Sequence, residues 1–563
     1  MQDGWPSADQ ATRCRAAAAK RARSWESPHQ STPKSPALPL PCGECSRVKT
    51  VTVKPKTHSP LGAEAEEKSA ASALPASTST EHEHFDVIIV GAGLSGIDAA
   101  WHLQKYCPRK RYIILEARAA SGGTWDLFRY PGVRSDSDMH TLGYRFRPWQ
   151  QPSAIADGAA ILSYLRSVAS DYGIDRNIRF QQRVLSASFS TQEAKWIVEI
   201  ASGPNQESRF VSCGFLWMCS GYYRYEAGYL PEFPGAAEYK GRIVHPQHWP
   251  QDLDYTDKKV VVIGSGATAV SLVPALAKTA AQVTMLQRSP SYLIARPSLD
   301  RVARWLRRWL PSKLASTLTR WKNILLGMGF YKLCKRWPQH GKALLLHGVR
   351  RLLGPDYDIG KHFTPRYNPW EQRLCLVPDA DLFTSIRQQK VQVVTDQVHS
   401  FTSTGIRLRS GVQLEADVVV TATGLVLQQL GGMKLYVDGT KVEASSTLFY
   451  KGLMYSGVPN LASVFGYTNA SWTLKADLVC RYVCRLLNYM DRNGFRQATP
   501  TNQDPTLTTK PWADLSSGYI QRGLPLQPKQ GSKEPWRLNQ NYILDLLSLR
   551  YGSVKDRAMV FRR

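Results

Sequence analysis

Two glycine-rich segments have the residue types and the spacing that bind dinucleotide cofactors. The first turn, Gly91-Ala-Gly93-Leu-Ser-Gly96, follows a short apolar run at 86–90 and precedes a helical pattern at 97–106. Its first glycine allows a tight turn, its second lets a pyrophosphate approach the backbone, and its third lets the helix pack on the strand. Glu116 ends the next predicted strand, where a carboxylate accepts hydrogen bonds from a ribose. This site is predicted to take a cofactor with a free ribose hydroxyl.

The second turn, Gly264-Ser-Gly266-Ala-Thr-Ala269, follows a predicted strand at 259–263 and opens a helix that leads to a strand at 283–286. That strand ends in Gln287-Arg288-Ser289, without an acid. A carboxylate there would repel a 2′-phosphate, whereas the Arg288 guanidinium can bind one through two hydrogen bonds. The second site is therefore predicted to take NADP, with Arg288 and Ser289 among its binding residues. The alternative for Arg288 is an exposed charge at the end of a strand.

These turns need parallel sheets to position them. Two apolar runs, 215–221 and 417–424, are predicted strands that return the chain to a sheet, and each ends in small residues and a glycine. The glycine of the second run, Gly424, is predicted to be a cofactor-binding residue. The sequence thus predicts an α/β fold with two dinucleotide-binding, Rossmann-like domains. Two such domains indicate a hydride passing from NADPH to a flavin, so the first site is assigned to FAD.

The predicted domain boundaries follow from these elements. A disordered tail is predicted at 1–84 and an NADP-binding domain at 226–415. The FAD-binding domain is predicted to consist of two segments of the chain, 85–225 and 416–563, which flank the NADP-binding domain in the sequence.

A longer motif lies between the two turns. It reads Tyr239-Lys-Gly241-Arg-Ile-Val-His245-Pro-Gln-His-Trp249-Pro250. In this motif the chain resembles the class B flavoprotein monooxygenases, and specifically the Baeyer–Villiger monooxygenases, whose signature has Phe where this chain has Tyr239. Trp249-Pro250 favours the Baeyer–Villiger branch over the N- and S-oxidising flavin monooxygenases, whose signature ends in Tyr. The resemblance implies that Gly241, His245 and Trp249 belong to a hinge that couples NADP binding to domain closure; the alternative for Trp249 is apolar packing.

Further segments are similar to the subgroup that contains the ethionamide-activating monooxygenase. They are 122–139, which includes Gly123, Thr124 and Trp125 as cofactor-binding residues, 368–375, 466–472 and 535–541. The likeness covers roughly 85–563. It implies FAD and NADPH as cofactors and O2 as a co-substrate.

The resemblance also assigns two catalytic residues. In the family a flavin C4a-peroxide must stay anionic to attack a ketone, and a fixed cation beside it can contribute about 3 kcal/mol. By position in the motif, Arg373 is that cation and Asp136 is the acid that pairs with it. Gln372 stands where many relatives have a Lys that helps to hold the 2′-phosphate of NADP, so the resemblance implies either a weaker cofactor preference or one that Arg288 provides alone. The alternatives are a structural salt bridge for Arg373 and a turn residue for Asp136.

The net charge of +27, from 72 Lys and Arg against 45 Asp and Glu, is concentrated in one region. Residues 296–370 hold 16 Lys and Arg and three Asp, a net of +13, with Trp, Leu and Arg at helical spacing. Such helices either lie on an anionic membrane surface as a peripheral association or form an insert packed on the NADP-binding domain with its charges in solvent. No nucleic-acid-binding motif accompanies the charge, and no transmembrane helix or metal site is predicted.

The tail and the cysteines leave the compartment open. Ten cysteines spread along the chain without a dense framework are typical of an intracellular protein, cytoplasmic or peripheral on a membrane. Basic residues near the N-terminus resemble an organellar targeting segment, and an untargeted extension is the alternative. Cys42-Gly-Glu-Cys45 is the only CxxC pair and precedes the first strand, which disfavours a flavin disulfide reductase.

The leading hypothesis is an NADPH- and O2-dependent monooxygenase acting on a small ketone or a thioether. The alternatives are an S- or N-oxidising flavin monooxygenase, an uncoupled NADPH oxidase, and a non-catalytic, membrane-associated flavin-binding scaffold. No motif marks the substrate, because ketone pockets are built from scattered apolar residues.

Overall fold

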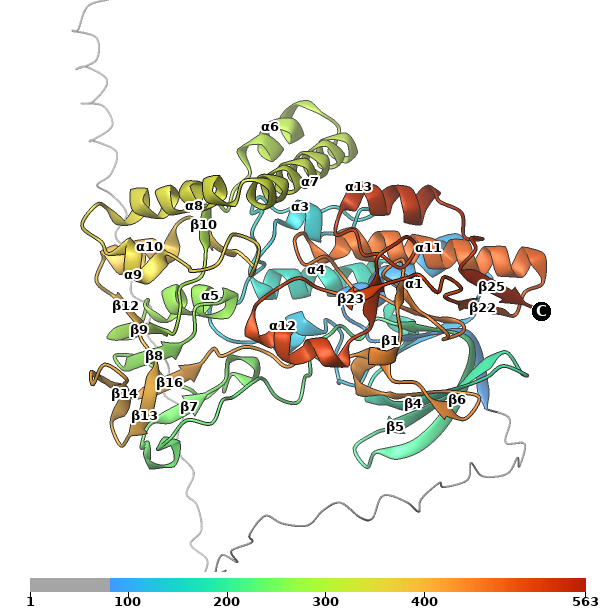
Figure 1. Cartoon of the computed structure of the whole chain (residues 1–563), viewed down its shortest axis with the longest axis horizontal. Coiled ribbons are helices and arrows are strands. Elements are labelled where there is room, and N and C mark those ends of the chain that lie inside the picture. The colour runs from blue at the N-terminus through green and yellow to red at the C-terminus, as the bar shows by residue number, and fades with distance from the viewer. Residues whose placement is uncertain (1–81) are drawn as a thin grey trace, which may run out of the picture. The chain divides into compact units, whose positions relative to one another are not determined.

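The computed structural model describes residues 82–563, so residues 1–81 of the predicted tail, with its CxxC pair, lie outside them. The first domain is built on a nine-stranded sheet in the order β18-β17-β4-β5-β6-β1-β2-β3, with β21 also pairing with β6 (Figure 1). Its strands are β1 (Glu83–Val90), β2 (Tyr112–Leu115), β3 (Ile178–Arg179), β4 (Gln182–Ser190), β5 (Lys195–Ser202), β6 (Glu207–Met218), β17 (Lys434–Val437), β18 (Thr440–Lys441) and β21 (Leu461–Ser463). The strand β1 starts at Glu83, two residues before the predicted boundary, because Glu83 pairs with Val211 of β6 and its carboxylate bonds Arg111 and Arg179.

The second domain holds a parallel five-stranded sheet in the order β12-β9-β8-β16-β7. Its strands are β7 (Arg242–Val244), β8 (Lys259–Ile263), β9 (Gln282–Gln287), β12 (Val391–Thr395) and β16 (Val418–Thr421). The β16 strand lies between β8 and β7, so the second domain continues to Thr421 and the predicted boundary at 415/416 is wrong by about one strand. The strand is apolar on both faces, as a central parallel strand must be, but its pairing with β7 and β8 decides which sheet it joins.

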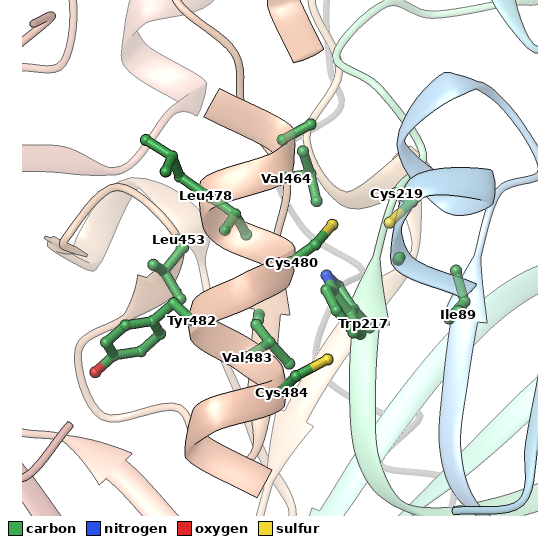
Figure 2. Close-up of a cluster of buried hydrophobic side chains, with 14 of the residues drawn as sticks. Ile89, Trp217, Cys219, Leu453, Val464, Leu478, Cys480, Tyr482, Val483 and Cys484 are labelled. Atoms are coloured by element: carbon green, nitrogen blue, oxygen red, sulfur yellow. The ribbon is translucent and has the colours of Figure 1, made fainter. Parts of the chain in front are cut away.

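Helices α1 (Leu94–Tyr106) and α11 (Trp472–Asn493), far apart in sequence, pack together against the first sheet. Figure 2 shows Cys480 and Cys484 of α11 directed toward Trp217 of β6, with Cys219 and Ile89 on the same side. Because α11 is apolar along most of its inward face, it returns the C-terminal part of the chain to the first domain.

Residues 296–370 fold into helices, as predicted. They are α6 (Arg301–Trp309), α7 (Ser312–Arg336), α8 (Pro338–Leu353) and α9 (Ile359–Phe363), flanked by the paired strands β10 (Leu293–Arg296) and β11 (Cys375–Pro378). Helix α8 contacts the second domain, but α6 and α7 also reach the first: Arg307 donates to the carbonyl oxygens of Trp149 and Gln150. The insert therefore does not pack on the NADP-binding domain alone. Within 82–563, no helix is both long and apolar enough to cross a membrane.

The other elements connect these units. They are α2 (Thr124–Leu127), α3 (Met139–Leu142), α4 (Gly158–Asp171), α5 (Ala267–Leu276), α10 (Asp381–Arg387), α12 (Gly518–Gly523), α13 (Tyr542–Asp545) followed by a π-helical segment (Leu546–Tyr551), β13 (Val398–Thr402), β14 (Gly405–Leu408), β15 (Gln413–Glu415), β19 (Phe449–Tyr450), β20 (Met454–Tyr455), β22 (Gln497–Pro500), β23 (Thr509–Pro511), β24 (Lys529–Gly531) and β25 (Met559–Arg562).

Candidate functional site

A cavity of about 850 Å³ joins the two domains. It is lined by the first turn, by the residues after β6, by the segment 122–137, and by the first residues of α5 in the second domain. Its size is in the upper range of small-molecule sites. Eight predicted site residues line it: Gly91, Gly93, Glu116, Gly123, Thr124, Trp125, Asp136 and Arg373.

The first turn is closed by direct backbone packing. Gly91 has φ +103°, and a Cβ there would lie 2.7 Å from the carbonyl oxygen of Cys219. A Cβ on Gly96 would overlap the carbonyl oxygen of Gly91, which explains why the helix can lie so close to the strand. Helix α1 begins after Gly93 without a side-chain cap, so its first backbone N–H groups are available to a pyrophosphate.

Glu116 lies at the end of β2, as predicted, and both of its oxygens are held. Ala92 N donates to Oε2 at 2.8 Å and Arg118 N donates to Oε1 at 2.9 Å. Burial raises the pKa of Glu116, and these two N–H donors oppose that rise. The hydrogen bonds orient the carboxylate toward the cavity, where it retains lone pairs for ribose hydroxyls.

The segment around Gly123 covers the first turn from the other side. A Cβ on Gly123 would lie 3.1 Å from the Cα of Gly93, so the two loops touch. Thr124 Oγ1 lies 3.2 Å from the Tyr225 hydroxyl, which ties this loop to the chain that leaves β6. Gly123, the Thr124 hydroxyl and the Trp125 indole thus form one wall of the dinucleotide cradle.

The second turn lies outside the cavity except for the start of α5. Gly264 and Gly266 precede α5, which begins without a side-chain cap, and Ala269 is fully buried in the position of the third glycine. The cavity is reached by Ala267, Thr268 and Ser271. Both Arg288 and Ser289 are exposed just after β9, where Arg288 forms no ion pair or hydrogen bond with the described residues. Its guanidinium is thus available to a phosphate, and the exposed-charge alternative remains open.

Arg373 lies two residues before β11 and donates from Nη2 to the Tyr222 hydroxyl at 3.2 Å. Its Nε is buried without a partner. Tyr222 in turn lies 2.7 Å, oxygen to oxygen, from Tyr223, and its ring stacks on Trp472 at 5.1 Å. Burial opposes the charge of Arg373, but Tyr222, Tyr519, Tyr223 and Asp136 outweigh it and raise its pKa well above the usual range. The cation is therefore permanent, and its side-chain hydrogen bond goes to the Tyr222 hydroxyl and not to a carboxylate.

Asp136 lines the same cavity but does not form the predicted direct ion pair with Arg373. Within the described residues it accepts no hydrogen bond and no salt bridge within 4.0 Å, and it is exposed. It follows the bridge between Arg134 and Asp157, a turn-like stretch that places it on the rim. Its charge still acts on Arg373 across the cavity, so the pairing is electrostatic and not a contact.

The signature residues lie where the chain crosses twice between the domains. His245 Nε2 donates to the Gly424 carbonyl at 3.2 Å, while its Nδ1 accepts from Gln247 N at 3.2 Å, which fixes the neutral tautomer. The two crossing segments also pair with each other, through Arg224 N to Val426 O and Gln428 N to Tyr222 O. This geometry fits a hinge, and it places Gly424 in the hinge rather than in the cavity.

Gly241 and Trp249 serve packing at the same joint. A Cβ on Gly241 would overlap the Asp417 carbonyl oxygen, so only glycine fits beside β16. Trp249 packs edge-on to Tyr255 at 6.2 Å among the apolar residues of the second domain. Gln247 ties the signature to the crossing by donating to the carbonyls of Arg224 and Tyr225.

The sequence did not point to Tyr222, Tyr223 and Tyr519, which surround Arg373. A signal existed for the first two, because they directly follow Ser220-Gly221 at the end of a predicted strand. Tyr519 carries no local signal, since it reaches Arg373 from a segment almost 150 residues away.

Comparisons with known proteins agree with this geometry. Residues 148–318 match the model of the flavin-binding monooxygenase-like family, and residues 89–151 match that of an NAD(P)-binding Rossmann-like domain. FAD-containing monooxygenase EthA of Mycobacterium tuberculosis is 55% identical over 482 residues, 85% of this chain and 98% of that protein. Probable FAD-binding monooxygenase AlmA of Acinetobacter baylyi is 47% identical over 481 residues, 85% of this chain and 96% of that protein.

Solved structures share the fold at low identity. A steroid monooxygenase bound to NADP superposes with a TM-score of 0.62 at 23% identity, covering 75% of this chain and 88% of that chain. OTEMO in complex with FAD and NADP superposes with a TM-score of 0.61 at 23% identity, covering 74% and 88%. These likenesses confirm the predicted two-domain α/β fold.

Proposed function

The chain belongs to the FAD-containing, NADPH-dependent class B flavin monooxygenases, and from that premise we propose that it carries out Baeyer–Villiger oxidation of ketones to esters or lactones, with sulfoxidation of thioethers as a second activity. The family membership confirms the predicted enzyme class. The finer assignment rests on the cavity and on Arg373.

The cofactors fit the two halves of the site. The first turn, Glu116 and the loop at 123–125 form a cradle whose glycines leave no room for a Cβ. Such a preformed cradle suits FAD. The start of α5 with Arg288 suits NADPH. When bound, the flavin supplies hydride acceptance from NADPH and activation of O2. The protein contributes the uncapped helix starts, the ribose-binding carboxylate and the enclosure of the reacting groups.

The observation that carries the proposal is a permanent cation with an unpartnered Nε, which lines the cavity and is hydrogen-bonded to the Tyr222 hydroxyl. Ketone oxidation develops negative charge on oxygen, and a fixed guanidinium in a poorly solvated site stabilises such charge. Oxidation of sulfur or nitrogen needs an electrophilic oxygen and gains less from that cation. Arg373 therefore favours ester formation over the alternative of a purely S- or N-oxidising enzyme.

An Arg373→Ala variant tests this assignment. Ester formation from cyclohexanone or phenylacetone should fall about 100-fold or more, while FAD content is retained. Product would be quantified by mass spectrometry beside NADPH consumption, with the exposed Arg366→Ala as the matched control. An unchanged ester yield in the Arg373 variant would refute the role of the cation. Wild-type enzyme that oxygenates only thioethers would point to the S-oxidising alternative, and NADPH consumption without any product to an oxidase.

Peripheral membrane association through the insert also belongs to the proposal. On α6, Val302, Trp305 and Trp309 are 47%, 61% and 67% exposed and share one face, beside a parallel row of exposed Arg301, Arg304 and Arg308. Aromatic and basic residues in adjacent rows suit an anionic lipid surface.

Flotation with vesicles tests the association. The holoenzyme should float with phosphatidylcholine vesicles that contain phosphatidylglycerol, in a salt-sensitive manner, and not with phosphatidylcholine alone. A Trp305→Ser/Trp309→Ser variant should lose flotation, whereas Val412→Ser, exposed on the turn between β14 and β15, should keep it. Equal flotation of both variants would exclude α6 as the contact.

A further inference from the structure

A second, smaller cavity of about 100 Å³ lies outside the cofactor site, between α7 and the C-terminal segment that starts with α13. Trp321 of α7 meets Tyr542 of α13 edge-on at 5.8 Å and closes one side. The chain that follows α3 forms the opposite wall. Figure 1 shows α7 and α13 at the same edge of the molecule. The volume is enough for several water molecules, and so for one tetrahedral oxyanion.

Three guanidiniums converge on this cavity without a carboxylate in its lining. Arg145, Arg320 and Arg550 come from three separate parts of the chain. Burial raises the pKa of Tyr542, and all three guanidiniums oppose the rise, while Asp477, which does not line the cavity, adds to it. Among the described residues, Arg145 and Arg550 donate no hydrogen bond to the protein. Arg145 is exposed, and Arg320 and Arg550 are partly buried. Three like charges at one small cavity repel one another, and an anion among them would relieve that repulsion.

The same cavity collects buried polar atoms that lack partners. His140 Nε2, Ser316 Oγ and Arg320 Nε make no hydrogen bond in the structure. His140 and Ser316 are only 8% and 9% exposed, so water does not readily solvate them. Arg320 is held in place by donating from Nη1 to the carbonyls of His140 and Gly143, and its Nε is left without a partner. Unpaired buried polar atoms are rare and costly, and these three belong to residues that line one small cavity.

We propose that this cavity binds a phosphate group. A phosphate offers acceptor oxygens in several directions, which matches donors that approach from three walls, whereas a planar carboxylate could meet only a pair of them. The phosphate is either free or the headgroup of an anionic lipid. Tyr551 lines the cavity and is 67% exposed, and Leu547, in the same π-helical segment, is 55% exposed, so a lipid headgroup in the cavity would have apolar surface near it for the acyl chains. The site is independent of the monooxygenase chemistry.

Calorimetric titration of the holoenzyme with inorganic phosphate tests the proposal. The protein is first saturated with FAD and NADP⁺, so that the cofactor sites do not compete, and chloride holds the ionic strength constant. One equivalent of phosphate should bind, and Arg145→Gln/Arg550→Gln should weaken the affinity at least about tenfold. The control Arg557→Gln, an exposed arginine of the same C-terminal region, should leave it unchanged. No binding, or equal binding to the wild type and the double variant, would overturn the proposal.

Vesicles distinguish the two sources. If a lipid headgroup is the ligand, the double variant should bind phosphatidic acid vesicles more weakly than the Arg557→Gln control, and free phosphate should compete. If the affinity for phosphate falls in the double variant while vesicle binding does not, the ligand is a soluble phosphate. Because Arg320 supports the backbone of α3, it is left intact in both experiments.

Discussion

The two dinucleotide turns share a motif but differ in how the protein holds them. In the first turn, Gly96 lies against the Gly91 carbonyl, Gly93 against Gly123, and Glu116 is bonded to Ala92 N. In the second turn the first glycine is packed as closely, since a Cβ on Gly264 would lie 2.4 Å from the carbonyl oxygen of Ala422. The turns differ at the next glycine: a Cβ on Gly93 would lie 3.5 Å from the Cα of Gly123, whereas one on Gly266 would meet nothing within 4 Å. The end-of-strand residue of the second turn, Arg288, is exposed instead of buried.

This difference between the two turns indicates which cofactor stays bound to the protein and which one exchanges. A cradle closed by backbone contacts and by a buried carboxylate is formed before the cofactor binds, so the bound state costs little ordering and the cofactor is held tightly. An open turn with an exposed arginine relies on a charge-assisted contact that forms only with the ligand. The first turn is therefore suited to a resident flavin and the second to a nucleotide that enters and leaves in each turnover.

The largest effect is expected from adding a methyl group to the closed turn. Gly96→Ala should abolish stable FAD retention, because the new Cβ overlaps the Gly91 carbonyl and overpacking of this kind costs about 1–3 kcal/mol or more. Gly266→Ala should retain FAD at the wild-type ratio, since its Cβ has open space. The flavin absorbance per protein after gel filtration measures both. Equal retention in the two variants would remove the contrast between the turns.

An intermediate effect is expected at the open turn. Arg288→Gln should raise the KM for NADPH about 10- to 100-fold, because it removes a charge-assisted contact that contributes roughly 1.5–3 kcal/mol. The KM for NADH, which lacks the 2′-phosphate, should stay nearly unchanged. Steady-state kinetics with NADPH and with NADH measure this difference in KM. Arg387→Gln, an exposed arginine of α10 in the same domain, should change neither constant. An equal rise in the KM for NADH would mean that Arg288 supports the fold and does not bind the 2′-phosphate.

The smallest effect is expected at the joint between the turns. Burial lowers the pKa of His245, and the hydrogen bond to the Gly424 carbonyl opposes this only in part. The folded pKa is thus below the unfolded value of about 6.5. As the pH falls below that value the unfolded state binds the proton first, so stability decreases down to the folded pKa.

His245→Gln should therefore show a shallower loss of stability between about pH 7.5 and pH 5.5 than the wild type. Denaturant midpoints at both pH values measure it, and His347→Gln, exposed on α8, is the control. The slope should not vanish, because burial also lowers the pKa of His140 and of His362. A slope equal to that of the wild type would assign the acid sensitivity to those other histidines.

Local patterns predicted the turns well, because each is read from consecutive residues. Gly91 and Gly93 follow β1, Gly96 lies in the first turn of α1 and Glu116 follows β2, as predicted. The helical insert forms where Trp, Leu and Arg recur at helical spacing. The predicted domain boundary at 415/416 is wrong because the pairing of a strand depends on residues far away in the sequence. An apolar run such as 417–421 reads as a buried strand but does not say which of two sheets it will join.

What the sequence determined by itself is the set of local elements: two glycine turns, the acid after one and the arginine after the other, and the signature between them. What only the tertiary structure decided is which distant residues meet. The tyrosines around Arg373, the missing contact to Asp136, and the arginines that surround the small cavity each come from segments far apart in the chain. Backbone turns follow from neighbours in sequence, whereas electrostatic surroundings follow from how whole elements pack.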